Sequence, residues 1–79
     1  MSLQTLYEIA GRDDHPWAAT RAAMVIAITE QLQAGNISND EARELMLDLV
    51  RMDQLDAEAD DIELKTALVQ AVFVVSKMV

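Results

Sequence analysis

The chain contains no cysteine, so disulfides and cysteine-based zinc sites are excluded. It has one histidine, three aromatic residues, two glycines and one proline among its 79 residues. So few glycines and prolines argue against a loop-rich or disordered chain. A domain this small, without covalent or metal cross-links, must gain its stability from apolar burial, and its 52% of hydrophobic residues can provide a core. We therefore predict a single domain over residues 1–79.

Basic residues are also scarce, because six Lys and Arg stand against fourteen Asp and Glu and give a net charge of −8. This charge repels nucleic-acid phosphates and anionic membrane surfaces, so we expect neither nucleic acid nor a membrane as a direct partner. No signal peptide is visible, and the apolar runs are shorter than the roughly 18 residues that span a bilayer. We expect a cytoplasmic protein, or one within a particle assembled there, such as an accessory protein of a bacterium or a bacterial virus.

Apolar spacing and capping residues predict four helices, and hence an all-α fold in the form of a small helical bundle. Ser2 caps a short first helix, which ends before Gly11. Pro16 lies in the first turn of a second helix that runs to about Ala34. We expect His15 to be exposed to solvent at the start of this second helix.

The connection after the second helix carries the clearest local signals in the sequence. Gly35 stands where helices commonly end in a left-handed residue, and Ile37 supplies the apolar contact that accompanies such a turn. Ser38 and Glu41 have the spacing of a capping box, in which each side chain bonds the backbone N–H of the other. A third helix over about Asn39–Met52 follows, and the short connection makes the two helices a hairpin.

Helical spacing assigns inward and outward faces to the two hairpin helices. The apolar residues that recur on the second helix are Trp17, Met24, Ile28 and Leu32, with Val25 beside them. The inward residues predicted on the third helix are Ala42, Leu45, Met46, Leu49 and Val50. We expect Trp17 to pack over the hairpin and Arg21 to lie on the solvent side. The residues predicted to face outward are Arg43, Glu44, Asp48 and Arg51, and the spacing of the last three allows a surface ion pair of little energetic weight.

The last predicted helix, Ile62–Val79, is apolar on nearly every side, and no second strand-like segment exists that would make it a strand. Its main apolar stripe is Leu64, Leu68, Ala71, Val72 and Val75. Val69, Phe73 and Val74 fall outside this stripe. Since so small a domain can hardly surround a whole helix, we expect these three residues to form an exposed candidate interface. The alternative is that a fully wrapped helix buries them within the monomer.

The segment from Asp53 to Glu63 is strongly acidic and contains no basic residue. Its six acids form a candidate acidic surface: Asp53, Asp56, Glu58, Asp60, Asp61 and Glu63. An EF-hand would need alternating acids and a central glycine, both missing here, so we expect no metal and no cofactor. We expect Asp60 or Asp61 to cap the last helix.

No catalytic or nucleotide-binding motif is present, so we expect that the protein is not an enzyme. The hairpin is not a DNA-binding helix-turn-helix, because its second helix would carry acids into the major groove. Two hypotheses remain. The first is an interaction or assembly module that forms homo-oligomers or docks on a larger complex through its apolar last helix. The second is a small acidic regulator that imitates nucleic acid and masks a basic site on another protein.

Overall fold

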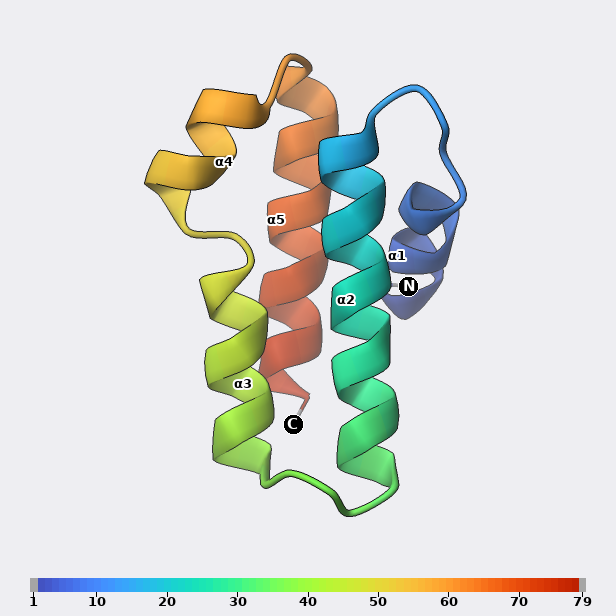
Figure 1. The fold of residues 1–79 in the computed structure, drawn as a ribbon, viewed down its shortest axis with the longest axis vertical. Coiled ribbons are helices and arrows are strands. Elements are labelled where there is room, and N and C mark those ends of the chain that lie inside the picture. The colour runs from blue at the N-terminus through green and yellow to red at the C-terminus, as the bar shows by residue number, and fades with distance from the viewer. Residues whose placement is uncertain (1, 79) are drawn as a thin grey trace.

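The computed structural model describes residues 2–78, and every secondary-structure element within this range is a helix. In chain order these are α1 (Ser2–Ala10), α2 (Pro16–Gln33), α3 (Asn39–Asp48), α4 (Met52–Glu58) and α5 (Ile62–Lys77) (Figure 1). The predicted all-α bundle is confirmed, with the four expected helices in place. The short α4 is an addition that the four-helix prediction does not include. Val79, at the predicted end of the last helix, and the Ser2 side chain, predicted as a cap, lie outside the described part of the chain.

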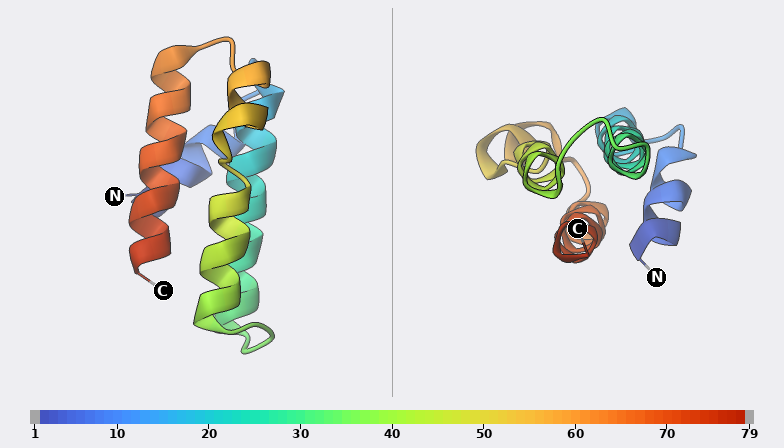
Figure 2. Two further views of the ribbon diagram at one scale, coloured as in Figure 1. Left: turned by 90° about the vertical axis from the view of Figure 1, so that its left-hand side faces the viewer. Right: turned by 90° about the horizontal axis from the view of Figure 1, so that it is seen from below.

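Three helices, α2, α3 and α5, run side by side along the long axis, as the end-on view in Figure 2 shows. The short α1 crosses this group obliquely and packs against α2 and α5. α4 lies beyond the end of α3, close to the start of α5 (Figure 1). The C-terminal helix is therefore covered along one side by α1, α2 and α3.

All five helices contribute to one hydrophobic core. Its buried members are Leu6, Ile9, Ala18, Ala22, Val25, Ile26, Ala42, Met46, Val50, Leu55, Leu64, Leu68, Ala71, Val72 and Val75. The stripe predicted on the last helix is buried in full, which confirms that face. Ala18 and Ala22 of α2 are completely buried, and side chains this small let neighbouring helices approach closely.

The predicted connection between α2 and α3 is confirmed in detail. Gly35 has a φ of +80°, and the backbone N–H of Asn36 donates to the carbonyl of Gln31 at 3.0 Å, as in a Schellman turn. The capping box is complete, because the Glu41 N–H donates to Ser38 Oγ at 3.1 Å and the Ser38 N–H donates to Glu41 Oε1 at 3.0 Å. These bonds fix where α2 ends and α3 begins.

The third helix ends at Asp48, so the predicted end near Met52 is wrong. The chain tightens after Asp48, where the N–H groups of Leu49 and Val50 each donate to the carbonyl three residues earlier, at 3.2 Å. The Leu49 carbonyl, which could continue an α-helix, accepts a hydrogen bond from Arg21 Nε at 2.9 Å instead. A long-range contact that the sequence does not reveal therefore lies at the end of this helix.

Candidate protein-interaction site

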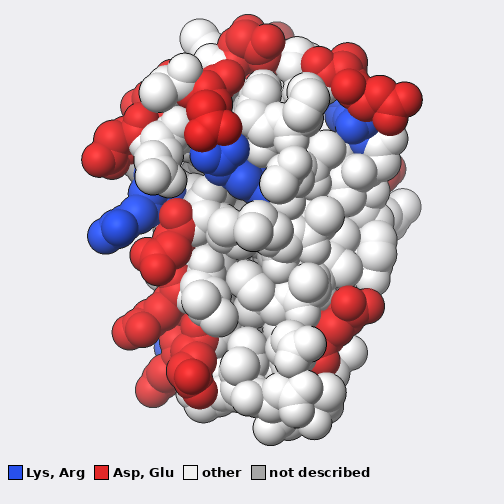
Figure 3. Space-filling view, viewed as in Figure 1, with Lys and Arg blue, Asp and Glu red and all other residues white. Residues whose placement is uncertain are grey.

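An open groove of about 360 Å³ lies between α2 and α3. Its lining residues are Met24, Ala27, Ile28, Leu45, Asp48 and Leu49. Figure 3 shows the same side of the molecule as a broad area without charged side chains, bordered by Asp and Glu along the α3 side. Most of the groove surface is therefore apolar and open to solvent.

The groove exists because two apolar residues predicted to point inward point outward. Met24 of α2 is 49% exposed and Leu45 of α3 is 45% exposed, so both inward predictions are wrong. On α2 the core-facing side is held by Ala18, Ala22, Val25 and Ile26. At about 100° per residue, Met24 then falls on the opposite side of the helix. On α3 the core-facing positions are held by Ala42 and Met46, which turns Leu45 away.

The α3 side of the groove carries acidic residues. Glu44 and Asp48 are exposed and four residues apart, so they lie on one side of α3, next to Leu45. Arg51 Nε lies 3.7 Å from Asp48 Oδ1, and both side chains are mostly exposed. This is the surface ion pair that the sequence predicts. Such an exposed pair contributes about 0–1 kcal/mol, so it leaves Asp48 available to other cations.

The predicted interface on the last helix is interrupted by polar side chains. Phe73 is 47% exposed and Val74 is 46% exposed, whereas Val69 is half-buried against the core. Phe73 and Val74 point about 100° apart, and Gln70 and Lys77 fall between them on the same exposed side of α5. These residues therefore do not form one continuous apolar surface.

The acids of the predicted acidic surface are mostly used within the molecule. Asp61 caps α5, because its Oδ1 accepts the N–H of Leu64 at 3.0 Å, as predicted. Asp56 forms an ion pair with Lys65. Glu58 and Asp60 also have intramolecular partners, described below. Asp53 and Glu63 are exposed on α4 and α5.

Arg21 joins three segments of the chain and is not a solvent-facing residue, so its predicted placement is wrong. Its side chain is only 12% exposed. The guanidinium donates to the carbonyls of Leu49 and Trp17 at 2.9 and 3.1 Å, and to both carboxylate oxygens of Glu58 at 3.1 and 3.0 Å. These hydrogen bonds with Arg21 lower the pKa of Glu58. The residue links α2 to the end of α3 and to α4.

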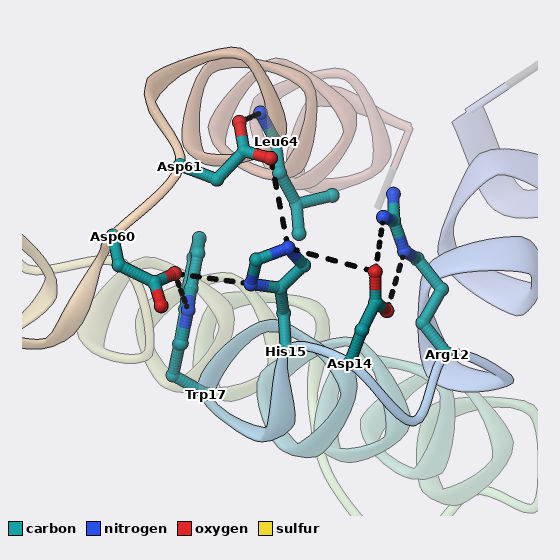
Figure 4. Close-up of polar contacts among 7 residues, drawn as sticks. All are labelled: Arg12, Asp14, His15, Trp17, Asp60, Asp61 and Leu64. Atoms are coloured by element: carbon teal, nitrogen blue, oxygen red, sulfur yellow. Dashed lines mark hydrogen bonds and ion pairs between the residues drawn. The ribbon is translucent and has the colours of Figure 1, made fainter.

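A polar cluster connects the start of α2 with the segment before α5 (Figure 4). His15 Nδ1 lies 3.0 Å from Asp60 Oδ1, and its Nε2 lies 3.6 Å from a carboxylate oxygen of both Asp14 and Asp61. Trp17 Nε1 donates to the same Asp60 oxygen at 3.0 Å. The His15 side chain is only 18% exposed, so the prediction of an exposed histidine is wrong. Of its acidic neighbours, Asp14 is adjacent in sequence, whereas Asp60 lies 45 residues away.

Two carboxylates of this cluster have lowered pKa values. Hydrogen bonds from Arg12, at 3.1 and 2.8 Å, lower the pKa of Asp14 to about 2. The indole N–H of Trp17 is the main cause that lowers the pKa of Asp60, and His15 adds a smaller effect in the same direction. Both carboxylates are therefore stabilised in the charged form by the folded structure.

We expect this cluster to make the free energy of unfolding decrease as the pH falls into the acid range. A carboxylate whose pKa is lower in the folded state stabilises that state above its unfolded pKa and loses this contribution as pH falls through its folded pKa. The loss is expected between the ordinary pKa of the two aspartates, 3.8, and the pKa of about 2 that Asp14 has in the folded state. Urea unfolding at a series of pH values should show stability decreasing over this window.

The matched variants are Asp60→Asn and Trp17→Phe, because one removes the carboxylate and the other removes the indole donor but keeps an aromatic ring. Both should be less stable than the native chain at pH 7 and should lose less stability on acidification. If their pH profiles run parallel to that of the native chain, Asp60 does not contribute to the acid dependence.

Within residues 2–78, no group of three or more His, Asp or Glu side chains is arranged to hold a metal ion. Over the same range, no helix combines the length and the apolar character that crossing a bilayer requires. No protein-family model matches the chain, and neither a curated protein nor a solved structure matches it. The groove is therefore the feature on which a functional proposal rests.

Proposed function

We propose that this protein is a non-catalytic protein–protein interaction module whose docking surface is the groove between α2 and α3. The observation that carries the proposal is the exposure of nearly half of the Met24 and Leu45 side chains beside an open apolar groove. Ile28 and Leu49 also pack against the core, but Met24 and Leu45 do not, so packing in the core does not account for these two apolar residues. Exposed apolar surface of this kind is typical of partner-binding sites.

The proposed occupant is a helix of another protein. Two neighbouring helices leave between them a lengthwise groove, and an amphipathic helix can lay its apolar face into such a groove. A second copy of this chain is a less suitable occupant. Each copy carries a charge of −8, and acids border the groove, so two copies repel each other as they approach.

Self-association through α5 is a second candidate, supported by the exposure of Phe73 and Val74. Light scattering on a sizing column tests it directly. A particle mass that is a multiple of 8.8 kDa, and that falls to 8.8 kDa in a still-helical Phe73→Asp variant, would support this candidate. A native mass of 8.8 kDa would leave the groove as the proposed docking surface.

The groove proposal can be tested with a neutral amphipathic peptide. The probe is an 18-residue helix with leucines at positions i, i+3, i+4 and i+7 and glutamine elsewhere, added to protein with ¹³C-labelled methionine methyl groups. Met24 lines the groove, whereas Met46 is buried in the core and Met78 lies at the far end of α5. We expect the Met24 resonance to shift on binding, with smaller changes at Met46 and Met78.

Two variants with matched exposure locate the binding surface. Leu45→Gln should weaken peptide binding about tenfold, because it removes apolar contact worth about 1.5 kcal/mol or more. Phe73→Gln, which changes a side chain of similar exposure on α5, should leave binding unchanged. Absence of a shift at Met24, or a loss of binding in Phe73→Gln alone, would overturn the groove proposal.

A further inference from the structure

We infer that the groove selects a basic amphipathic helix, one that places Lys or Arg along its edge next to α3. This inference rests on the proposed function, because it names the class of partner for the same surface. It follows from the distribution of charge around the groove. It also gives the acidic character of the protein a role in recognition.

The two sides of the groove differ in charge. On the α2 side, the lining residues Met24, Ala27 and Ile28 are all uncharged. On the α3 side, Asp48 lines the groove, and Glu44 is exposed one turn earlier. A partner helix seated in the groove therefore meets apolar side chains on one edge and carboxylates on the other.

The basic side chains of the protein do not neutralise this acidic edge. Five of its six Lys and Arg residues lie in ion pairs with carboxylates of the chain, namely Arg12, Arg21, Arg43, Arg51 and Lys65. Among the ion pairs seen within residues 2–78, the one between Arg51 and Asp48 involves an acid of the groove, and that contact is long and exposed. A cation on the partner can therefore replace or join Arg51 beside Asp48 at little cost.

The spacing on α3 specifies the pattern that the partner needs. Glu44 and Asp48 are four residues apart, which is about 6 Å along a helix axis. Basic residues at positions i and i+4 of a partner helix have the same spacing, so both can reach the acidic edge at once. Apolar residues of the same helix would then face Met24, Leu45 and Leu49. The expected partner is a protein segment with this combined pattern.

The test uses three 18-residue helices with the same leucine face and with Lys, Gln or Glu on the polar face. Binding to the native chain is measured by calorimetry at about 50 and 300 mM NaCl. At low salt we expect the Lys peptide to bind at least about tenfold more tightly than the Gln peptide, and the Glu peptide to bind most weakly. The advantage of the Lys peptide should shrink at high salt, because exposed charges are screened over a Debye length of about 10 Å or less.

A pair of double variants separates local recognition from net charge. Glu44→Gln with Asp48→Asn should reduce the advantage of the Lys peptide several-fold and leave the Gln peptide unaffected. Glu8→Gln with Glu63→Gln makes the same change in net charge on α1 and α5, which do not border the groove, and should preserve that advantage. An equal loss in both double variants would overturn the inference, because net charge alone would explain the preference.

The remaining outcomes distinguish the two proposals. If the Gln peptide binds at Met24 but the Lys peptide binds no more tightly at low salt, the groove is a docking surface and the charge inference is wrong. If none of the peptides shifts the Met24 methyl resonance, the proposed function itself fails. If the Lys peptide binds equally well to Leu45→Gln, it binds outside the groove, and the inference is again overturned.

Discussion

Leu68→Ala is expected to remove about 3 kcal/mol from the free energy of unfolding, within the range of about 2–5 kcal/mol that truncation of a buried leucine costs. Leu68 has no exposed surface and lies in the middle of α5, the helix that packs against α1, α2 and α3. A domain of 79 residues is stable by roughly 4–12 kcal/mol in total, so this loss is a large fraction of the whole. Urea unfolding followed by circular dichroism at 222 nm measures it.

The matched control is Phe73→Ala, five residues further along the same helix. Its side chain is 47% exposed, so the truncation leaves no enclosed cavity and should cost less than about 1 kcal/mol. The two variants together test which side of α5 faces the core. A loss in Phe73→Ala as large as that in Leu68→Ala would show that another surface covers Phe73, either in the monomer or in an oligomer.

The features that the sequence predicts correctly depend on neighbours within a few residues. The turn at Gly35 needs a residue that tolerates a positive φ, and the capping box needs only Ser38 and Glu41 three residues apart. Asp61 caps α5 through the N–H of Leu64, again three residues away. Such hydrogen bonds do not depend on distant parts of the chain, so a short residue pattern in the sequence is sufficient to predict them.

Two of the wrong predictions, those for Arg21 and His15, involve partners that are distant in sequence. Arg21 is isolated among apolar residues of α2, and only the fold brings it to Leu49 and Glu58, 28 and 37 residues away. His15 is likewise enclosed by the segment before α5, at a distance of 45 residues. Charge and local spacing alone give no means of finding these contacts.

The groove could not be located by periodicity for a different reason. Apolar residues occur on nearly all sides of α2, so a pattern at helical spacing fits more than one face. The stripe through Met24 and Ile28 fits that spacing, but the structure buries the stripe of Ala18, Ala22 and Val25 instead. The sequence feature that does indicate an exposed apolar surface is the apolar character of α2 as a whole. A helix that is apolar on all sides in a small bundle leaves some of its apolar residues exposed.

Arg21→Ala should be the most damaging change of a charged residue, with an expected loss of about 2 kcal/mol. The substitution leaves the part-buried Leu49 carbonyl without its 2.9 Å donor, and a fully buried polar group left unsatisfied costs about 1–3 kcal/mol. It also removes the bidentate contact to Glu58 that holds α4. Urea unfolding gives the total loss, and hydrogen exchange should show the amides of α4 losing protection before those of α2 and α5.

Two further variants distinguish the parts of this contact. Glu58→Gln keeps the guanidinium in place against the Leu49 and Trp17 carbonyls. It removes the charge and one of the two acceptor oxygens of a carboxylate that is 52% exposed, so it should cost much less than Arg21→Ala. Arg21→Lys keeps the charge but loses the planar fork that bonds three partners at once, so it should recover only part of the stability. If Glu58→Gln matches Arg21→Ala, the ion pair accounts for the whole effect, and the bond to the end of α3 contributes nothing. If Arg21→Lys restores full stability, charge alone is sufficient and the fork geometry is not needed.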